Sequence, residues 1–280
     1  MSDAYAIVLR DRGIVEVAGA DAAAFLQGMI TNDIAKVGTR QGIYAALLTP
    51  QGKIVYDFLI FAAPDGFYLD CVKTYAPDLT ARLKRYKLRA KVTVTDRSDD
   101  LAVVAVDSEA SEARAVQDPR LAALGLRAVI PMAEAGAVNE RLELEFENRR
   151  LRLGVPNAAV DIPPETLFPL DCNLEELNGV DFAKGCYVGQ ELTARMKHRA
   201  TARRRLLPVS AATALPPPGT TLTRDGIEIG ELRGSSAMRG MALVRLDRLG
   251  NADEAMADGI AVRITRPAYP LILPAADAPA

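Results

Sequence analysis

The sequence has little of what metal sites and base-stacking surfaces are made from: one histidine, three cysteines, no tryptophan and 5% aromatic residues. Cys172, Cys186 and His198 could supply three metal ligands at most, and they are far apart in the chain. Structural zinc takes four ligands, commonly in close pairs, so no zinc site is predicted. An odd number of widely spaced cysteines in a long chain is typical of reduced thiols, and we therefore expect a cytoplasmic protein.

Long apolar runs, targeting patterns and an excess of one charge are also missing. No run approaches the ~20 apolar residues that a membrane span needs, and residues 1–10 resemble neither a signal peptide nor a transit peptide. The net charge is −2, from 34 basic and 36 acidic residues. We therefore expect no membrane partner and no global field for nucleic acid, whose direct binding is not predicted.

Three motifs of common enzyme classes are absent. Neither the glycine-rich dinucleotide fingerprint nor the phosphate-binding P-loop occurs, and no Gly-x-Ser-x-Gly elbow accompanies the single histidine. These absences argue against Rossmann enzymes, P-loop enzymes and serine hydrolases. The composition, 49% hydrophobic and 25% charged, is that of a globular protein, and 280 residues suggest two or three domains.

Alternating apolar residues and turn signals predict an α+β first half. A turn at Pro64-Asp65-Gly66 predicts a hairpin, and Leu79 and Leu83 share one face of a predicted helix. Residues 49–135 are interpreted as a hairpin–helix–strand–strand–helix–strand unit that is ferredoxin-like. The predicted strands are 6–9, 14–17, 43–48, 53–62, 67–72, 91–95, 101–107, 128–131 and 142–146, and the predicted helices 22–26, 75–86 and 111–124.

Two regions of the second half differ in character. Residues 155–175 are rich in proline, which disfavours regular structure, but their apolar content predicts an ordered, packed segment. After the turn at 216–219, short strands at 220–223, 228–233, 240–245 and 260–265 predict a small β-barrel. The tail at 274–280 is expected to be disordered.

Two runs of basic residues stand out against the balanced net charge. Residues 184–205 carry seven Lys or Arg against one carboxylate, and residues 82–91 carry six Lys or Arg and no acid. Such runs are usually solvated faces. Within a cleft they would attract an anion such as a polyglutamate tail, a phosphate or RNA, although aromatics interleave too thinly with these basic residues, as Tyr86 does, to support base stacking more than weakly.

The segment from Lys184 to Glu191 concentrates the candidate chemistry. Gly185 and Gly189 bracket Cys186 and Tyr187, so the backbone can turn tightly and present the thiol. Lys184 and Arg195 would favour the thiolate if they folded close to it. A glycine-kinked loop whose cysteine packs inward explains the same residues equally well.

This octamer, Lys-Gly-Cys-Tyr-Val-Gly-Gln-Glu, resembles the signature of YgfZ-type folate-binding proteins, which are relatives of the glycine-cleavage T-protein. Residues 169–174 and 190–195 look most like the mitochondrial iron–sulfur assembly branch of that family. Weaker similarities run in the same order along most of the chain, at 25–33, 49–54, 88–92, 150–156 and 241–245.

The resemblance implies a three-domain ring with two α+β domains, the second ferredoxin-like, and a small C-terminal β-barrel. The expected domains are a folate-binding domain of residues 1–48 and 136–204, a ferredoxin-like domain of 49–135, and the barrel of 205–280 with its tail. The resemblance further implies a tetrahydrofolate-binding accessory protein for assembly or repair of iron–sulfur enzymes, including radical enzymes that modify tRNA; together with the cysteine pattern, we expect this protein in the cytoplasm.

Carried over by position, Cys186 would be the functional thiol, and the cofactor would be tetrahydrofolate or a one-carbon derivative. Arg150 would face the folate carboxylates or the pterin, Arg195 would support a buried Glu191, and Asn32 and Asp57 are further candidates. The other residues implied to shape the pocket are Lys184, Tyr187, Gln190 and Glu191.

One departure from the T-protein bears on the reaction. Where the T-protein has adjacent aspartates, this chain has Tyr56-Asp57, so base help near the folate would have to come from Asp57 alone. The sequence therefore leaves open a folate-dependent one-carbon (aminomethyl-type) transferase as the alternative, and an RNA-binding module acting through the basic run at 197–205 as a third.

Overall fold

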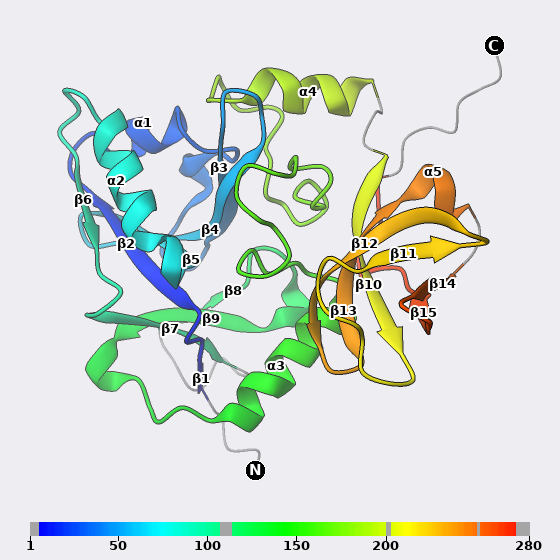
Figure 1. Cartoon of the computed structure of the whole chain (residues 1–280). Helices are drawn as coiled ribbons and strands as arrows, with labels where there is room; N and C mark the ends of the chain where they lie inside the picture. Colours follow the sequence, from blue (N-terminus) through cyan, green and yellow to red (C-terminus); the bar gives the residue numbers. More distant parts are fainter. Residues whose placement is uncertain (1–5, 107–113, 200–202, 251–252, 273–280) are drawn as a thin grey trace. The chain divides into compact units, whose positions relative to one another are not determined.

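The computed structural model describes residues 6–106, 114–199, 203–250 and 253–272. The chain divides into two compact units, whose elements are labelled in Figure 1. The first unit comprises Met1–Pro50, Val55–Leu144 and Leu177–Val188, and the second comprises Gln51–Ile54, Glu145–Glu176 and Gly189–Ala280.

The first unit contains a five-stranded sheet of order β3-β4-β5-β2-β6. The predicted hairpin is present: β4 and β5 pair antiparallel from Phe58 opposite Cys71 to Ala63 opposite Gly66. The strands are β2 (Arg12–Ala18), β3 (Ile43–Leu48), β4 (Ile54–Ala63), β5 (Gly66–Val72) and β6 (Thr93–Asp96). The helical segments are α1 (Ala22–Gln27), η1 (Ile34–Lys36), η2 (Lys73–Tyr75) and α2 (Ala76–Tyr86).

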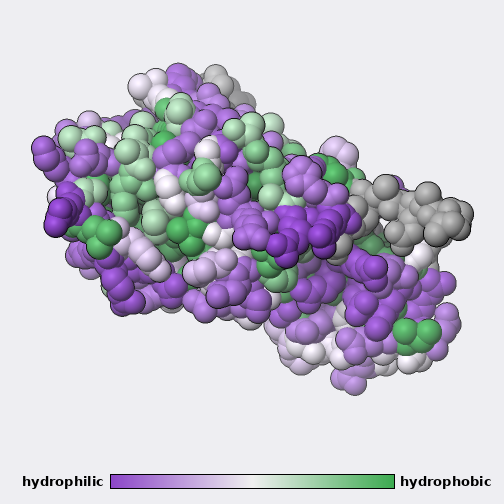
Figure 2. Space-filling view, turned by 90° about the horizontal axis from the view of Figure 1, so that it is seen from above, coloured by the Kyte–Doolittle hydropathy of each residue, from purple (hydrophilic) through white to green (hydrophobic). Residues whose placement is uncertain are grey.

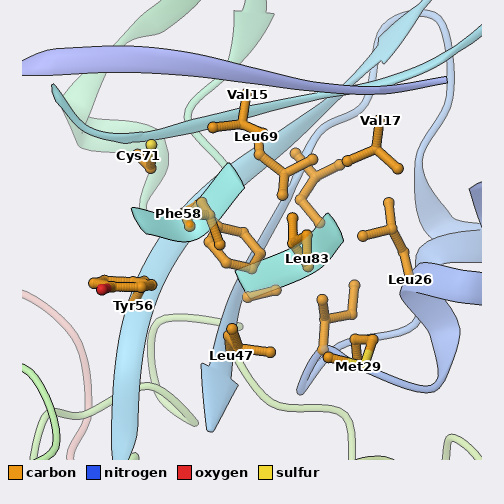
Figure 3. Close-up of a cluster of buried hydrophobic side chains, with 14 of the residues drawn as sticks. Val15, Val17, Leu26, Met29, Leu47, Tyr56, Phe58, Leu69, Cys71 and Leu83 are labelled. Atoms are coloured by element: carbon orange, nitrogen blue, oxygen red, sulfur yellow. The ribbon is translucent and has the colours of Figure 1, made fainter. Parts of the chain in front are cut away.

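One face of this sheet carries the apolar core (Figure 3). Leu83 of α2 and Leu26 of α1 point into the cluster that Phe58 and Leu69 form on the sheet. Burying each such side chain contributes about 1.5–3 kcal/mol. The spacing of Leu79 and Leu83 therefore explains why α2 lies on this face, as predicted.

A second, four-stranded sheet of order β1-β7-β9-β8 completes the unit. Its strands are β1 (Ala6–Val8), β7 (Leu101–Val106), β8 (Val116–Gln117) and β9 (Leu126–Pro131). Arg127 on β9 donates to Asp70 on β5 over 2.7 Å and so links the two sheets. The strands of residues 49–135 are thus shared between two sheets, because hairpin and turn signals specify neighbours and not distant partners.

Two predicted elements are wrong. Residues 114–124 do not form a helix but contain β8 and a 3-10 turn, η3 (Ala122–Leu124); residues 107–113 lie outside the described part. The alternating segment Leu142–Phe146 is not a strand but part of α3 (Glu140–Leu153), which follows η4 (Met132–Glu134). The alternation misled because Leu144 is 52% exposed, so it reports no buried face, and the surrounding Glu, Arg and Leu favour helix.

The second unit contains the predicted β-barrel, which is closed in the order β10-β13-β12-β11-β14-β15. Its core includes Leu207, Leu222, Leu232 and Val262. The strands are β10 (Arg204–Ala211), β11 (Thr221–Arg224), β12 (Ile227–Ser236), β13 (Arg239–Arg245), β14 (Glu254–Ala257) and β15 (Ile260–Ile264). The unit also contains the helices α4 (Gln190–His198) and α5 (Leu246–Leu249). The proline-rich stretch is ordered in turns, as expected, and the tail at 274–280 lies outside the described residues.

Candidate functional site: the cysteine loop and its supports

The cysteine loop, residues 181–188, precedes α4 and presents Cys186 to solvent. A side chain at Gly185 would meet nothing within 4 Å, so the backbone beside the thiol is open. The other cysteines, Cys71 and Cys172, are buried. Of the two readings of this loop, the structure therefore favours a presented thiol over a packed one.

Lys184 anchors the cysteine loop through hydrogen bonds of its ammonium group. Its ammonium donates to the carbonyl oxygens of Gln27 (2.8 Å), Ile30 (2.7 Å) and Asn32 (2.8 Å), at the end of α1 and in the following turn. Carbonyls at a helix end have no partner within the helix, and a cation satisfies them well. The ammonium also lies 5.0 Å from the centre of the Tyr187 ring, a cation–π distance.

The electrostatics of Lys184 follow from its position. The side chain is buried, and burial lowers its pKa to about 8, although the nearby charges of Asp33 and Asp181 oppose this shift. At neutral pH the amine is therefore still a cation and can donate all three hydrogen bonds. Lys184 acts as a clamp on the turn after α1, and its amine is not directed at the thiol.

Further hydrogen bonds fix the segment on both sides of Cys186. The Thr31 hydroxyl donates to the Gly179 carbonyl (2.6 Å), and the Asp181 amide donates to the Thr31 carbonyl (2.9 Å). On the other side, the Val188 amide donates to the Gly28 carbonyl over 3.3 Å. The thiol thus lies on a short span held at both ends by one turn.

Asn32 and Asp57 lie in the same unit but play different parts. The Asn32 amide donates to the carbonyls of Tyr44 (2.8 Å) and Asn178 (2.7 Å), and these three residues line a polar hollow of about 330 Å³. The Tyr44 hydroxyl donates to one oxygen of the buried Asp57 (2.7 Å). The other oxygen, Oδ1, is buried and has no hydrogen-bond partner among the described residues. Leaving such an atom unsatisfied costs about 1–3 kcal/mol, so it needs an explanation.

Glu191, Arg195 and Gln190 belong to α4 in the second unit. Arg195 pairs with Glu191 over 2.5 Å, one helical turn apart, as the resemblance implied. The expectation of a buried Glu191 is wrong, because its side chain is 86% exposed. A solvated pair of this kind contributes about 0.3–0.5 kcal/mol, so the carboxylate is available to another group.

Arg150 does not face solvent or a hollow, contrary to expectation. Its side chain is 3% exposed and donates to Glu147, to the Val155 carbonyl (2.6 Å) and to Asp161 (2.9 Å). Burial alone would lower the Arg150 pKa, but the charges of Asp161 and Glu147 outweigh burial and raise it. Arg150 ties the end of α3 to the following loop, and sequence spacing could not reveal that its donors are used internally.

Sequence reasoning missed the surroundings of Tyr56. Its hydroxyl donates to Asp78 on α2, its ring lies 5.2 Å from the ring of Tyr75, and the Arg82 guanidinium lies 5.9 Å away. A carboxylate from the helix therefore lies at the hydroxyl of Tyr56, the residue that replaces one of the T-protein's adjacent aspartates. The only available signal was Asp78 in the first turn of an amphipathic helix, which is an ordinary placement.

The described residues contain no cluster of three or more His, Cys, Asp or Glu that could hold a metal ion. Burial raises the pKa of Cys71 to about 12, so this thiol is inert, as expected for a buried small side chain. Cys172 is also fully buried. In the part of the chain described here, no helix has the length and apolar character to cross a membrane.

The chain has the fold of the glycine-cleavage T-protein. Residues 10–115 match the model of the GCVT N-terminal domain, and residues 203–270 match that of the CAF17 C-terminal β-barrel domain. The crystal structure of the glycine cleavage system aminomethyltransferase T from Bartonella henselae matches with a TM-score of 0.68, covering 93% of this chain and 84% of that chain. At 17% identity this likeness shows the fold alone.

The chain belongs to the family of the iron–sulfur cluster assembly factor IBA57. It is 33% identical to the mouse protein over 86% of this chain and 77% of that protein, and 34% identical to the human protein over the same shares. It is 38% identical to a Mycosarcoma maydis homologue over 75% of this chain, and there spans 58% of the relative's length. The resemblance to the iron–sulfur branch of the family is confirmed.

The expected cytoplasmic location is contradicted. The mouse, human and Mycosarcoma maydis relatives are all named as mitochondrial proteins. The expectation rested mainly on the cysteine pattern, which separates reducing from oxidising compartments but does not distinguish one reducing compartment from another.

Proposed function

We propose that this chain is a tetrahydrofolate-binding accessory protein for assembly or repair of iron–sulfur clusters, and that the Cys186 thiol does its chemistry. The observation that carries the proposal is the exposure of Cys186 on a loop clamped at both ends. A catalytic or transfer thiol must be accessible and held in place, whereas a structural cysteine is buried.

In this proposal the iron–sulfur cluster is a substrate that the protein passes on, and not its resident cofactor. Thiolates are the usual ligands of iron–sulfur clusters. As the Cys186 thiol loses its proton to solvent, a sulfur–iron bond forms, and the bond from the same iron to a donor ligand breaks. The exchange is redox-neutral and needs no oxidant. Release to a client protein is the same exchange in reverse.

The folate part of the proposal is supported by one carboxylate of the first unit. Asp57 Oδ1 is a buried acceptor without a partner among the described residues, and a pterin presents N–H donors that pair well with a carboxylate. Bound tetrahydrofolate would supply a carrier for a one-carbon unit. In the first unit, Asp57 would hold the pterin.

The partners proposed are iron–sulfur assembly proteins and client enzymes, including the radical enzymes that modify tRNA. The names of the mouse and human relatives support the assembly role. The tRNA connection rests on the resemblance of the octamer at 184–191 to its YgfZ-type signature, and it does not require this chain to bind RNA.

Cluster transfer to a purified apo-client enzyme tests the thiol. A reconstituted donor, the client and this protein are mixed, and client activity is followed over time. Cys186→Ser should abolish the acceleration while leaving the fold and folate affinity intact. Cys172→Ala is the matched control, because it removes a buried thiol and should retain transfer per folded molecule. Full acceleration by Cys186→Ser would refute the thiol role.

Calorimetric titration with tetrahydrofolate tests the pocket. Asp57→Asn should weaken binding by at least about 1.4 kcal/mol, which is tenfold, because one acceptor becomes a donor facing donors. Asp65→Asn, in the exposed hairpin turn, is the control and should bind as wild type. Absence of binding by the wild type would remove the folate part and leave the thiol part standing.

A folate-dependent aminomethyl-type transferase is the second candidate, favoured by the fold it shares with the aminomethyltransferase. Asp78, paired with Tyr56, would then supply the second carboxylate. Turnover of methylamine-bearing lipoyl carriers to methylene-tetrahydrofolate, lost in Asp78→Asn, would support it. No turnover across a panel of such carriers counts against it.

A further inference from the structure

The connection between α2 and β6 displays a nearly bare leucine. Leu88 is 86% exposed, and Tyr86, at the end of the helix, is 47% exposed. Single exposed apolar residues are ordinary, and the face in Figure 2 is a mosaic of hydrophilic and hydrophobic residues. Exposure alone therefore does not distinguish Leu88 from Leu144 on α3, which is 52% exposed.

The backbone of Leu88 does distinguish it. Its φ is +46°, in the left-handed region where a residue with a side chain costs about 1–2 kcal/mol. A leucine cannot offset this cost with a local hydrogen bond, as asparagine or aspartate does. Strained residues of this kind persist where the surroundings enforce them, and they cluster at functional sites.

The surroundings do enforce this turn. The Ala90 amide donates to the Lys87 carbonyl (2.8 Å), and the Lys87 ammonium donates to the Val92 carbonyl (2.9 Å). The Lys91 amide donates to the Asp21 carboxylate over 2.7 Å. The leucine is thus presented by a closed, hydrogen-bonded turn rather than by a loose loop.

Basic residues flank this leucine in the sequence. We call the exposed residues of this turn and the preceding helix end the basic corner; its members are Lys84, Arg85, Tyr86, Leu88, Arg89 and Lys91. None of its four cations forms an ion pair with an acidic side chain of the described residues. Two acids that contact this helix and turn are engaged with other groups: Asp78 lies 3.9 Å from Arg82, and Asp21 accepts from the Lys91 backbone.

We propose that the basic corner is a docking surface for a protein partner that offers an apolar hollow for Leu88, ringed by aspartate or glutamate side chains. Protein interfaces have this anatomy, with a few apolar or aromatic anchors at the centre and a charged rim. Four unpaired cations supply the rim and complement carboxylates, which steer encounter and set orientation.

RNA and an anionic membrane fit the same surface less well. Single-stranded nucleic acid is held by stacking on several aromatic faces, and Tyr86 is the only aromatic side chain of the basic corner. Membrane attachment takes a broad apolar face or a lipid chain, and one leucine is far smaller. The combination of one apolar anchor with a cationic rim therefore favours a folded acidic partner.

Carbodiimide coupling tests the proposal, because this reagent joins lysine amines to carboxylates in contact with them. The full-length protein is incubated with a soluble extract of its own cells, coupled, and analysed for peptides joined to Lys84 or Lys91. The variants are Leu88→Asp, Arg85→Glu with Arg89→Glu, Leu88→Gly, and Leu144→Asp as a matched exposed leucine. Binding of total tRNA and of cardiolipin-containing vesicles is measured in parallel.

We expect one protein coupled through its Asp or Glu residues, with yield falling at least about tenfold in Leu88→Asp and in the double charge reversal, and unchanged in Leu144→Asp. Leu88→Gly should raise the melting temperature, since glycine tolerates this φ, yet reduce coupling. Coupling unaffected by Leu88→Asp, or no coupling by the wild type, overturns the proposal. So does loss of tRNA or vesicle binding in place of coupling.

Discussion

Removing the Lys184 ammonium should loosen the turn that carries the thiol, and Lys184→Met isolates this effect. Methionine keeps most of the length and apolar body of the side chain but leaves the carbonyls of Gln27, Ile30 and Asn32 without their donor. Each buried polar group left unsatisfied costs about 1–3 kcal/mol. Because the wild type also spends energy on burying a charge, we expect a net loss of about 3 kcal/mol.

Differential scanning calorimetry at pH 7 measures this loss. For a unit of this size, 1 kcal/mol corresponds to a shift of about 2–4 °C, so the transition of the first unit should fall by roughly 6–12 °C. Lys36→Met is the control: Lys36 pairs with Asp181 but is 49% exposed, and such pairs are worth about 0–1 kcal/mol. A Lys184→Met protein that melts together with the control would refute the clamp.

Three further perturbations address other parts of the chain. Burial alone would raise the pKa of Asp118, but the charges of the neighbouring arginines lower it; its stabilisation is therefore present above its ordinary pKa and lost as pH falls through the folded value. In Asp118→Asn, the free energy of unfolding measured with urea should therefore fall less steeply as the pH is lowered. An unchanged dependence on pH in the acid range would contradict this. Arg150→Met leaves Asp161 buried and uncompensated and should cost about 3–5 kcal/mol in urea unfolding, whereas a loss under about 1 kcal/mol would exclude the buried pair. Gly154→Ala places a Cβ 2.6 Å from Pro267 at φ +74° and should lower the melting temperature of the second unit, which an unchanged transition would disprove.

Local patterns predicted most elements where hydrophobic period and turn chemistry agree. The β4–β5 hairpin, α2 and the barrel strands β11, β12 and β13 follow directly from such patterns. The pattern failed at α3, where Leu142, Leu144 and Phe146 alternate along the chain without facing a strand partner. Period alone cannot distinguish an exposed helix face from a half-buried strand when the apolar residues are few.

The sequence singles out the cysteine of the candidate site but not the residues that hold its loop in place. Gly185 and Cys186 indicate a turn that carries a thiol. The carbonyl oxygens that accept hydrogen bonds from Lys184, however, lie more than 150 residues earlier in the chain. Arg150 illustrates the converse. The sequence motif predicts that Arg150 contacts the folate, but its guanidinium donates to Glu147 and Asp161 instead. Such non-local pairings depend on the folded topology, which spacing does not encode.

The division into units has a consequence for synthesis. Because the first unit takes its last segment from Leu177–Val188 and the second includes Gln51–Ile54, neither is a continuous stretch of the gene. On the ribosome, the first unit cannot close until residue 188 has left the exit tunnel, long after its sheets have been made. This last segment contains both Lys184 and Cys186. The thiol therefore takes its exposed position in the same step that completes the first unit.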